Sequence, residues 1–300
     1  MNWILLAVGS SLLLGIYDIT KKKAAHGNAV PAVLLISVCV GALLWIPLVT
    51  WASVDPTSQP ITRLRVEPLS YYSHGLIVLK SILVGFSWTC SLFALKHLPL
   101  SIAAPIRSSS PLWTIAIATL FLGERPSMGQ WVGIAIVLLA FWRFSILGSR
   151  EGINFRRDRW VGCMILATLS GAVSSIYDKY LLQTALIPPA TLQAWFSIYL
   201  VPVMVPLFLW WFFCERSEKP FHFHWSILAI SPLLLTADML YFTAVADPEA
   251  LISVISTVRR CSVVVAFAYG ARYLQEAQWR PKAWCVAAIL LGVMILTCAP

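Results

Sequence analysis

The sequence predicts an all-α integral membrane protein with ten transmembrane helices, arranged as two inverted five-helix repeats. Composition gives the class, because 59% of the residues are hydrophobic and only 12% are charged, whereas a soluble domain is about 25% charged. Apolar windows of about 20 residues recur along the chain, and each is long enough to cross a bilayer core of about 30 Å. Similarity between the two halves predicts the repeat.

The apolar windows define the elements in order, and short polar connections separate them. The predicted spans are 3–20, 29–51, 75–95, 101–122, 129–147, 160–182, 191–213, 225–246, 250–273 and 281–298. The longest connection runs from Ala52 to His74, so no segment is large enough for a soluble domain. The first window lacks the preceding basic segment of a cleavable signal, and we expect it to remain in the mature protein.

The residues that could carry metal or covalent chemistry are scattered. The seven cysteines lie mostly inside spans with no Cys-x-x-Cys spacing, which is typical of small packing residues. No nucleophile–base pair or metal-ligand set at usable spacing occurs inside the spans, so we expect no enzyme activity and no cofactor or metal.

Basic residues are distributed unevenly among the connections. Of the 22 Lys and Arg residues, 14 follow odd-numbered spans, four follow even-numbered spans and four lie within spans. The positive-inside rule then predicts that the odd-numbered connections are cytoplasmic and both termini lie outside. We expect a multi-pass protein of the cell (inner) membrane. The position of Lys21–Lys23, either in a loop or at the mouth of a cavity, stays open.

The second half repeats the first. A displacement of 160 residues aligns Ile16-Tyr17-Asp18 with Ile176-Tyr177-Asp178, and one of 152 aligns Arg107 and Glu124 with Arg259 and Glu276. We therefore divide the chain into residues 1–150 and 151–300. Because each half has an odd number of spans, the second half crosses the membrane in the opposite sense. Such inverted repeats are typical of secondary transporters, whose substrate site lies near the midplane between the halves.

The motifs that carry a family resemblance lie in and after the fourth span. The segments Ala-Pro-Ile-Arg-Ser-Ser-Ser-Pro-Leu (104–112), Leu-Phe-Leu-Gly-Glu-Arg-Pro (120–126) and Gln-Trp-Val-Gly (130–133) resemble the EamA-type repeat of the drug/metabolite transporter superfamily. The second half resembles it more loosely at 274–276 and 290–293. The resemblance implies a ten-span transporter, and related ten-span transporters are commonly described with cytoplasmic termini, against the charge count.

A shorter resemblance concerns the ninth span. Residues 256–265 are similar to the basic pair of triose-phosphate and nucleotide-sugar transporters, which contacts the substrate phosphate in those families. Here Arg-Arg stands where those families usually have Lys-Arg or Lys alone. The resemblance implies a substrate with a phosphate group.

Three arginines inside spans, Arg107, Arg259 and Arg260, are the main candidates for a site. An Arg at the centre of a lipid-exposed span costs about 2.5–3.5 kcal/mol even on the lenient insertion scale, so all three should face a polar interior. With Lys80, the spans hold four cations against three plausible carboxylates, and one positive charge is left over. This surplus favours a bound anion, because Arg matches phosphate or carboxylate with two hydrogen bonds. The alternative is a structural role in which each Arg pairs an internal carboxylate or caps helix carbonyls.

Arg259 and Arg260 cannot both face one point, because adjacent helical residues are about 100° apart. Since Arg259 aligns with Arg107 in the repeat, we expect Arg259 to bind the substrate and Arg260 to contact a neighbouring helix.

The other candidates are polar or aromatic residues within the spans. For substrate binding they are Lys80, Tyr17, Tyr177, Tyr241 and Trp88, and for gating or coupling they are Asp18, Asp178, Lys179 and Asp238. The Tyr-Asp pairs could instead lie in the interfacial belt, Lys80 could snorkel, and Trp88 could be a packing residue. We expect Asp238 to pair with Lys80 or Arg260, and Glu124 and Glu276 to stabilise tight turns.

The sequence therefore favours a secondary transporter that moves a small anionic or zwitterionic metabolite, phosphorylated compounds included, by alternating access. A broad exporter of amino acids or drugs with structural arginines is a second interpretation, and a non-transporting lipid-handling protein is a third. Small multidrug exporters rely on a Glu in the first span, and this chain has none there. The expected partners are a small-molecule substrate and the lipid bilayer without nucleic acid, and a homodimer remains open.

Overall fold

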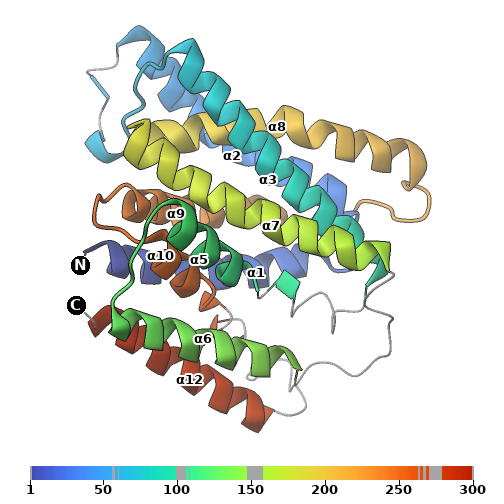
Figure 1. Ribbon diagram of the computed structural model, residues 1–300. Helices are drawn as coiled ribbons and strands as arrows, with labels where there is room; N and C mark the ends of the chain where they lie inside the picture. The colour runs from blue at the N-terminus through green and yellow to red at the C-terminus, as the bar shows by residue number, and fades with distance from the viewer. Residues whose placement is uncertain are drawn as a thin grey trace.

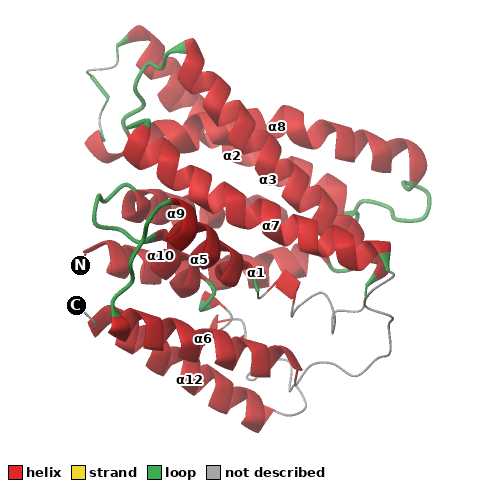
Figure 2. Ribbon diagram, in the orientation of Figure 1, coloured by secondary structure: helices red, strands yellow, loops and turns green. Residues whose placement is uncertain are grey.

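The all-α class is confirmed by the computed structural model (Figure 1), in which each predicted span contains an α-helix. The structure describes residues 2–55, 58–59, 61–98, 106–107, 109–146, 158–262, 264–265, 268–269 and 279–298, and these residues form helices and connecting segments without strands (Figure 2). The predicted turn residue Glu276 lies outside this described set. The helices are α1 (Asn2–Ala25), α2 (Val30–Val54), α3 (Tyr71–His97), α5 (Ser110–Phe121), α6 (Met128–Ile146), α7 (Arg159–Lys179), α8 (Pro189–Cys214), α9 (Ser226–Val245), α10 (Ile252–Arg259) and α12 (Trp279–Cys298), with the short 3₁₀-helix η1 (Thr62–Leu64) and the π-helix η2 (Tyr180–Thr184).

Six helical segments are long and apolar enough to cross a membrane, namely α1, α2, α3, α7 continued by η2, α8 and α9. Three shorter apolar helices lie in α5, α6 and α12. Length and composition therefore make this a multi-pass membrane protein.

Span nine differs from the expected continuous helix. Helix α10 ends at Arg259, and the next amides form tighter bonds three residues back, from Arg260 to Thr257 (3.2 Å) and from Cys261 to Val258 (2.9 Å). A change from α to 3₁₀ spacing alters the angle between successive side chains. The expected continuous helix over 250–273 is therefore wrong at Arg260.

The first helix is longer than predicted and includes Lys21–Lys23 in its last turns. Cations at the C-terminus of a helix interact favourably with the helix dipole. These lysines therefore belong to a helix end and not to a loop.

Helices from the two halves of the sequence pack side by side. The most extensive pairings are α1 with α9, α3 with α7, α2 with α8, and α6 with α12. In Figure 1 the α6–α12 pair lies at one edge of the molecule, and both chain ends lie at the same end of the bundle, which we call the terminal end.

Glycines allow two close helix crossings. A Cβ atom on Gly133 of α6 would lie 2.9 Å from the carbonyl oxygen of Gly292 of α12, and one on Gly292 would lie 3.0 Å from that of Gly133. Small residues at such crossings let helix backbones approach each other in membranes. In the same way, a Cβ on Gly15 of α1 would lie 2.8 Å from the carbonyl oxygen of Ser262, so α1 is held against the chain that follows Arg260.

Candidate functional site

A buried ion pair joins α3 to α7. Lys80 donates to Asp178, with side-chain exposures of 3% and 6%, and the Tyr241 hydroxyl of α9 donates to the other carboxylate oxygen at 3.1 Å. The Lys80 ammonium also lies 4.6 Å from the ring centroid of Phe196 and 5.1 Å from that of Phe242. Lys80 and Asp178 are therefore interior residues, and both the snorkelling position for Lys80 and the interfacial position for Asp178 are excluded by their burial.

A second ion pair joins α9 to α10. Arg259 Nη2 lies 2.6 Å from Asp238 Oδ1, and the guanidinium lies 3.9 Å from the centroid of the Tyr241 ring. The expected partners of Asp238, Lys80 and Arg260, are wrong. Because Asp238 precedes Tyr241 by three residues on one helical face, both can contact the same guanidinium.

The third group of charges is the Asp18 cluster, made of Asp18, Lys21, Arg107, Arg260 and Ser262. Asp18 lies within electrostatic range of all three cations and beside Ser262, and Arg260 lies within range of Arg107. Asp18 and Arg107 are exposed to solvent although other residues surround them. The cluster is therefore polar, inside the bundle and open to water.

Two aromatic rings border this cluster. Lys21 Nζ lies 5.4 Å from the centroid of Tyr17 and 5.5 Å from that of Trp88. These distances are within the range of cation–π interactions. Tyr17 and Trp88 thus lie beside Lys21 of the cluster.

The two ion pairs and the Asp18 cluster differ in net charge. Lys80 with Asp178 and Arg259 with Asp238 form neutral pairs, whereas the Asp18 cluster holds three cations and one carboxylate, an excess of two positive charges. The predicted surplus of positive charge is therefore present, and it is concentrated around Arg107 and Arg260. The contact to a neighbouring helix, expected of Arg260, is made by Arg259.

A further network lies at the terminal end of the bundle. Glu124, in the turn after α5, has a side chain only 2% exposed; it lies 2.6 Å from Lys179 Nζ and accepts hydrogen bonds from the amides of Ile252 (2.8 Å) and Ser253 (3.1 Å). Lys179 also donates to the carbonyl of Ala250 at 3.0 Å. We call this network the Glu124 clamp, and it ties α7 and the N-terminus of α10 to the α5–α6 turn.

The predicted site residues thus fall into different groups. Lys80, Asp178, Tyr241, Arg259 and Asp238 form the interior ion pairs, and Lys179 belongs to the Glu124 clamp. Tyr177 lies apart from both arginine groups, and its hydroxyl donates to the carbonyl of Leu76 at 3.1 Å.

Sequence reasoning missed the full role of Glu124 and the place of Lys21. Glu124 was expected to stabilise its own turn, but it also caps α10 by accepting hydrogen bonds from the amides of Ile252 and Ser253 and from the Ser253 hydroxyl. Lys21 was counted with the connections, yet it stands three and four residues after Asp18 and Tyr17. That helical spacing could have revealed it.

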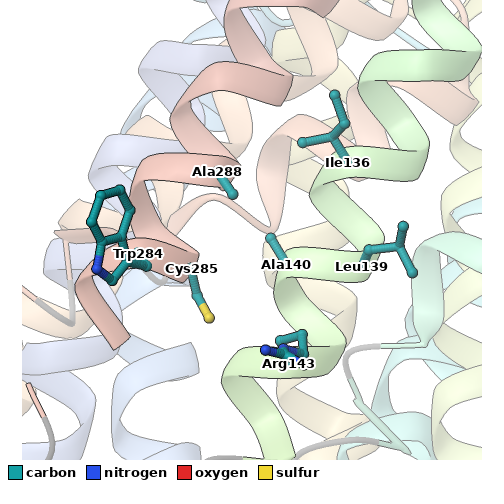
Figure 3. Close-up of a pocket in the computed structure, with 7 residues that line it drawn as sticks. All are labelled: Ile136, Leu139, Ala140, Arg143, Trp284, Cys285 and Ala288. Carbon is teal, nitrogen blue, oxygen red and sulfur yellow. The ribbon is translucent and has the colours of Figure 1, made fainter. Parts of the chain in front are cut away.

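A groove lies elsewhere, between α6 and α12 (Figure 3). It has a volume of about 550 Å³ and is lined by Ile136, Leu139, Ala140, Arg143, Trp284, Cys285 and Ala288. Its lining is mainly apolar, with Arg143 near one end (Figure 3). This groove is on the edge pair of helices and shares no residue with the three charged groups.

Comparison with known proteins agrees with the helical architecture and the motifs. Residues 1–146 match the model of the EamA-like transporter family. The chain is 26% identical to the pseudopaline exporter CntI of Pseudomonas aeruginosa over 136 residues, which cover 45% of this chain and 43% of the exporter. It is 30% identical over 80 residues to the probable 4-amino-4-deoxy-L-arabinose-phosphoundecaprenol flippase subunit ArnE of Pectobacterium atrosepticum, covering 27% of this chain and 71% of that subunit.

A protein of known crystal structure has the same overall fold. The two superpose with a TM-score of 0.70 at 15% sequence identity, covering 99% of this chain and 97% of the other. Likeness at this identity concerns the fold alone. Together, the helices define a multi-pass membrane protein, and the family match and the flippase subunit identify its family: the chain belongs to the EamA-like transporter family of the drug/metabolite transporter superfamily.

Proposed function

We propose that this protein is a secondary transporter of the cell (inner) membrane that moves a small anionic or zwitterionic metabolite by alternating access. The observation that carries the proposal is the Asp18 cluster, in which two excess positive charges lie within the bundle and are open to water. Cations without carboxylate partners favour a bound anion, because Arg pairs with phosphate or carboxylate through two hydrogen bonds. The exporter and flippase functions named for the relatives support transport.

The cluster offers complementary contacts for a zwitterion. Arg107 and Arg260 can each donate two hydrogen bonds to a carboxylate or phosphate, and Asp18 can accept hydrogen bonds from an ammonium group. The name of the flippase subunit includes both an amino group and a phosphate group, which is the same pair of charges. The aromatic rings of Tyr17 and Trp88 lie beside Lys21 at the border of this proposed substrate site.

The pairing of helices supports the division at residues 150 and 151 into two inverted repeats. In the repeat, α7 is the counterpart of α1, α9 of α3, and α10 of α5. Helix α1 packs against α9, and the counterpart pair α7 and α3 also pack together. Likewise α5 packs against α7, and the counterpart pair α10 and α1 also pack together. The Asp18 cluster then lies where elements of both halves meet, as expected for a substrate site in an inverted-repeat transporter.

A ligand panel on the purified protein tests the charge of the substrate. We expect phosphorylated compounds, dicarboxylates or amino acids to raise the midpoint of thermal unfolding, since a ligand stabilises the native state by RT ln(1+[L]/Kd). Arg107→Gln and Arg260→Gln should each abolish this shift. Arg143→Gln, the same change in the groove between α6 and α12, is the matched control and should retain it.

Transport in proteoliposomes provides the second measurement. The compound that stabilises the protein should be taken up by the wild type and by Arg143→Gln, and not by Arg107→Gln or Arg260→Gln. Stabilisation by organic cations alone, with uptake unchanged in both cluster variants, would favour a broad exporter with structural arginines. Absence of flux for every ligand that binds would favour the non-transporting, lipid-handling interpretation.

A further inference from the structure

The groove between α6 and α12 results from the way in which the two helices cross. They approach closely at Gly133 and Gly292, where an added Cβ would lie 2.9 Å or 3.0 Å from the facing carbonyl oxygen. Ile136, the first lining residue of the groove, stands beside this crossing, with its side chain 3.2 Å from the Cβ position of Gly292. Arg143, at the other end of the α6 wall, follows Gly133 by ten residues, which is about 15 Å along a helix. The groove of about 550 Å³ therefore runs from the crossing toward the C-terminal end of α6 (Figure 3).

The groove opens at the periphery of the molecule. The α6–α12 pair lies at one edge of the bundle (Figure 1), and two lining residues of the groove, Leu139 and Trp284, are 61% and 79% exposed. Leu290 and Met294, farther along α12, are exposed as well. Large apolar side chains at the periphery of a membrane-spanning bundle meet lipid chains, which are as apolar as leucine. The groove therefore faces the hydrocarbon of the bilayer.

One end of the groove lies at the depth of the lipid headgroups. Arg143 is in the last turn of α6, next to the exposed Trp142, and Trp284 is in the second turn of α12. Tryptophan is enriched at the membrane–water interface, and an Arg close to a helix end extends its guanidinium toward that interface. The groove thus leads from the headgroup level at Arg143 into the apolar core at Ile136.

The guanidinium of Arg143 is accessible to a ligand in the groove. The Arg143 side chain is exposed, and Figure 3 shows it between the two helices, on the side of Cys285. It lies within electrostatic range of the Cys285 thiol, which confirms that it is directed toward α12. The ion pairs found in the described part of the chain involve other residues.

The two ends of the groove complement the two parts of a phospholipid. A guanidinium donates two parallel hydrogen bonds to a phosphate, and Arg143 offers such a group at the headgroup level. The remaining lining residues are apolar apart from the Cys285 thiol, and they match an acyl chain. A headgroup without an ammonium group keeps its full negative charge, so a single Arg favours an anionic phospholipid over a zwitterionic one. Basic pockets between transmembrane helices bind anionic headgroups in this way.

We propose that this groove binds one anionic phospholipid of the surrounding bilayer, with the lipid phosphate on Arg143 and an acyl chain along Ile136, Leu139 and Ala288. The bound lipid fills the space between the two helices on one side of their glycine crossing and thereby stabilises the edge pair. The groove shares no residue with the Asp18 cluster. Lipid binding is therefore independent of the proposed substrate site, and loss of the lipid leaves substrate binding unchanged.

Native mass spectrometry of the purified, delipidated protein tests the lipid site. The probes are phosphatidylglycerol and phosphatidylcholine with the same acyl chains, each added in detergent without substrate. We expect one phosphatidylglycerol per protein chain, at an occupancy several-fold higher than that of phosphatidylcholine. Equal occupancy by both lipids would show that the groove does not select for charge, and a dimer that retains neither lipid would show that a second copy covers it; either result overturns the proposal.

Two substitutions test the two ends of the groove separately. Arg143→Gln should lower the occupancy of phosphatidylglycerol several-fold, to that of phosphatidylcholine, and Leu139→Ser should lower the occupancy of both lipids because it makes the acyl-chain wall polar. Arg216→Gln is the matched control and should retain the lipid, since Arg216 is also an exposed Arg near a helix end, 4.7 Å from the ring centroid of Phe212. Unchanged occupancy in Arg143→Gln would refute the site.

Thermal unfolding gives a second readout and checks that the variants fold. Phosphatidylglycerol should raise the unfolding midpoint of the wild type and of Arg216→Gln by a few degrees, and should leave that of Arg143→Gln unchanged. Without lipid, Arg143→Gln should unfold at the wild-type midpoint because the side chain is exposed. An excess of glycerol phosphate, which is the headgroup without acyl chains, should not displace the lipid; displacement would indicate a site for free phosphate and would overturn the lipid assignment.

Discussion

At the scale of single residues, the three intramembrane arginines have different surroundings. Arg259 is bonded to Asp238 and lies over Tyr241, whereas Arg260 lies near Arg107 and Asp18. The residue that the sequence alignment favoured for substrate is thus the one with a carboxylate already bound to it. In the proposed transporter we therefore expect Arg107 and Arg260, and not Arg259, to contact the substrate.

Substitution of Arg259 should therefore lower the stability of the protein, whereas substitution of Arg260 should not. Arg259→Gln leaves the Asp238 carboxylate without its cation and should lower the free energy of unfolding by about 1–3 kcal/mol. Arg260→Gln removes a like charge near Arg107 and should leave stability unchanged or slightly higher. Chemical denaturation of both variants in detergent checks this, and a larger loss in Arg260→Gln would contradict the assignment.

The buried pair of Lys80 and Asp178 should behave as one unit. Lys80→Met leaves a carboxylate that is 6% exposed without its cation, which should cost about 3–5 kcal/mol. The double variant Lys80→Met/Asp178→Leu should recover most of that loss, because both charges are removed together. A double variant no more stable than Lys80→Met would indicate that the pair contributes net stability. The measurement is the unfolding midpoint of the two proteins.

At the scale of elements, close crossings and helix interruptions position the charged groups. The approach of Gly15 to the carbonyl of Ser262 brings α1, and with it Asp18, to the segment after α10. Helix α10 ends at Arg259, and Arg260 then lies within electrostatic range of Arg107 and Asp18. Backbone geometry thus decides which arginine reaches which carboxylate.

The crossing of α6 and α12 gives a direct test of close packing. Gly133→Val should lower stability by about 1–3 kcal/mol, because the new side chain would overlap the Gly292 backbone. Gly162→Ala of α7 is the control, since a Cβ there meets no atom within 4 Å, and it should stabilise by about 0.5–1 kcal/mol. Thermal unfolding compares the two, and equal midpoints would argue against the crossing.

At the scale of the whole molecule, the two ends of the bundle differ. The Glu124 clamp joins α7, α10 and the α5–α6 turn at the terminal end, whereas the Asp18 cluster is open to water and lies past the midpoint of α1, toward its C-terminal end. In an alternating-access cycle the clamp would have to break when the site opens toward the terminal end. We therefore expect Glu124 and Lys179 to act as gating residues in the proposed transporter.

Weakening the clamp should expose residues beneath it. In a cysteine-free background, a cysteine at Ala250, which is 1% exposed, should react slowly with a membrane-impermeant maleimide. Glu124→Gln removes the charge that holds Lys179 and should increase the labelling rate several-fold. Glu218→Gln, at an exposed position in the connection after α8, is the control. The same rate in all three proteins would indicate that the clamp does not limit access.

Much of the architecture could be predicted from the sequence, because membrane spans are specified by long apolar windows. All ten windows contain helices, and their ends agree within a few residues where the helices are continuous. The exceptions are the extension of α1 through Lys21–Lys23, the start of α5 at Ser110 in the window 101–122, and the end of α10 at Arg259. Such ends depend on contacts with other helices, which a local pattern does not record.

The sequence alone determined that charged residues lie inside a helical membrane protein, and that positive charge is in excess there. Charge and hydropathy are properties of the chain, so a count is sufficient for both. Only the tertiary structure decided that Asp238 pairs with Arg259 and Asp178 with Lys80, and that Asp18 lies within electrostatic range of Lys21, Arg107 and Arg260. The reason is physical: an ion pair depends on the distance between side chains of different helices, and that distance is set by how the helices cross.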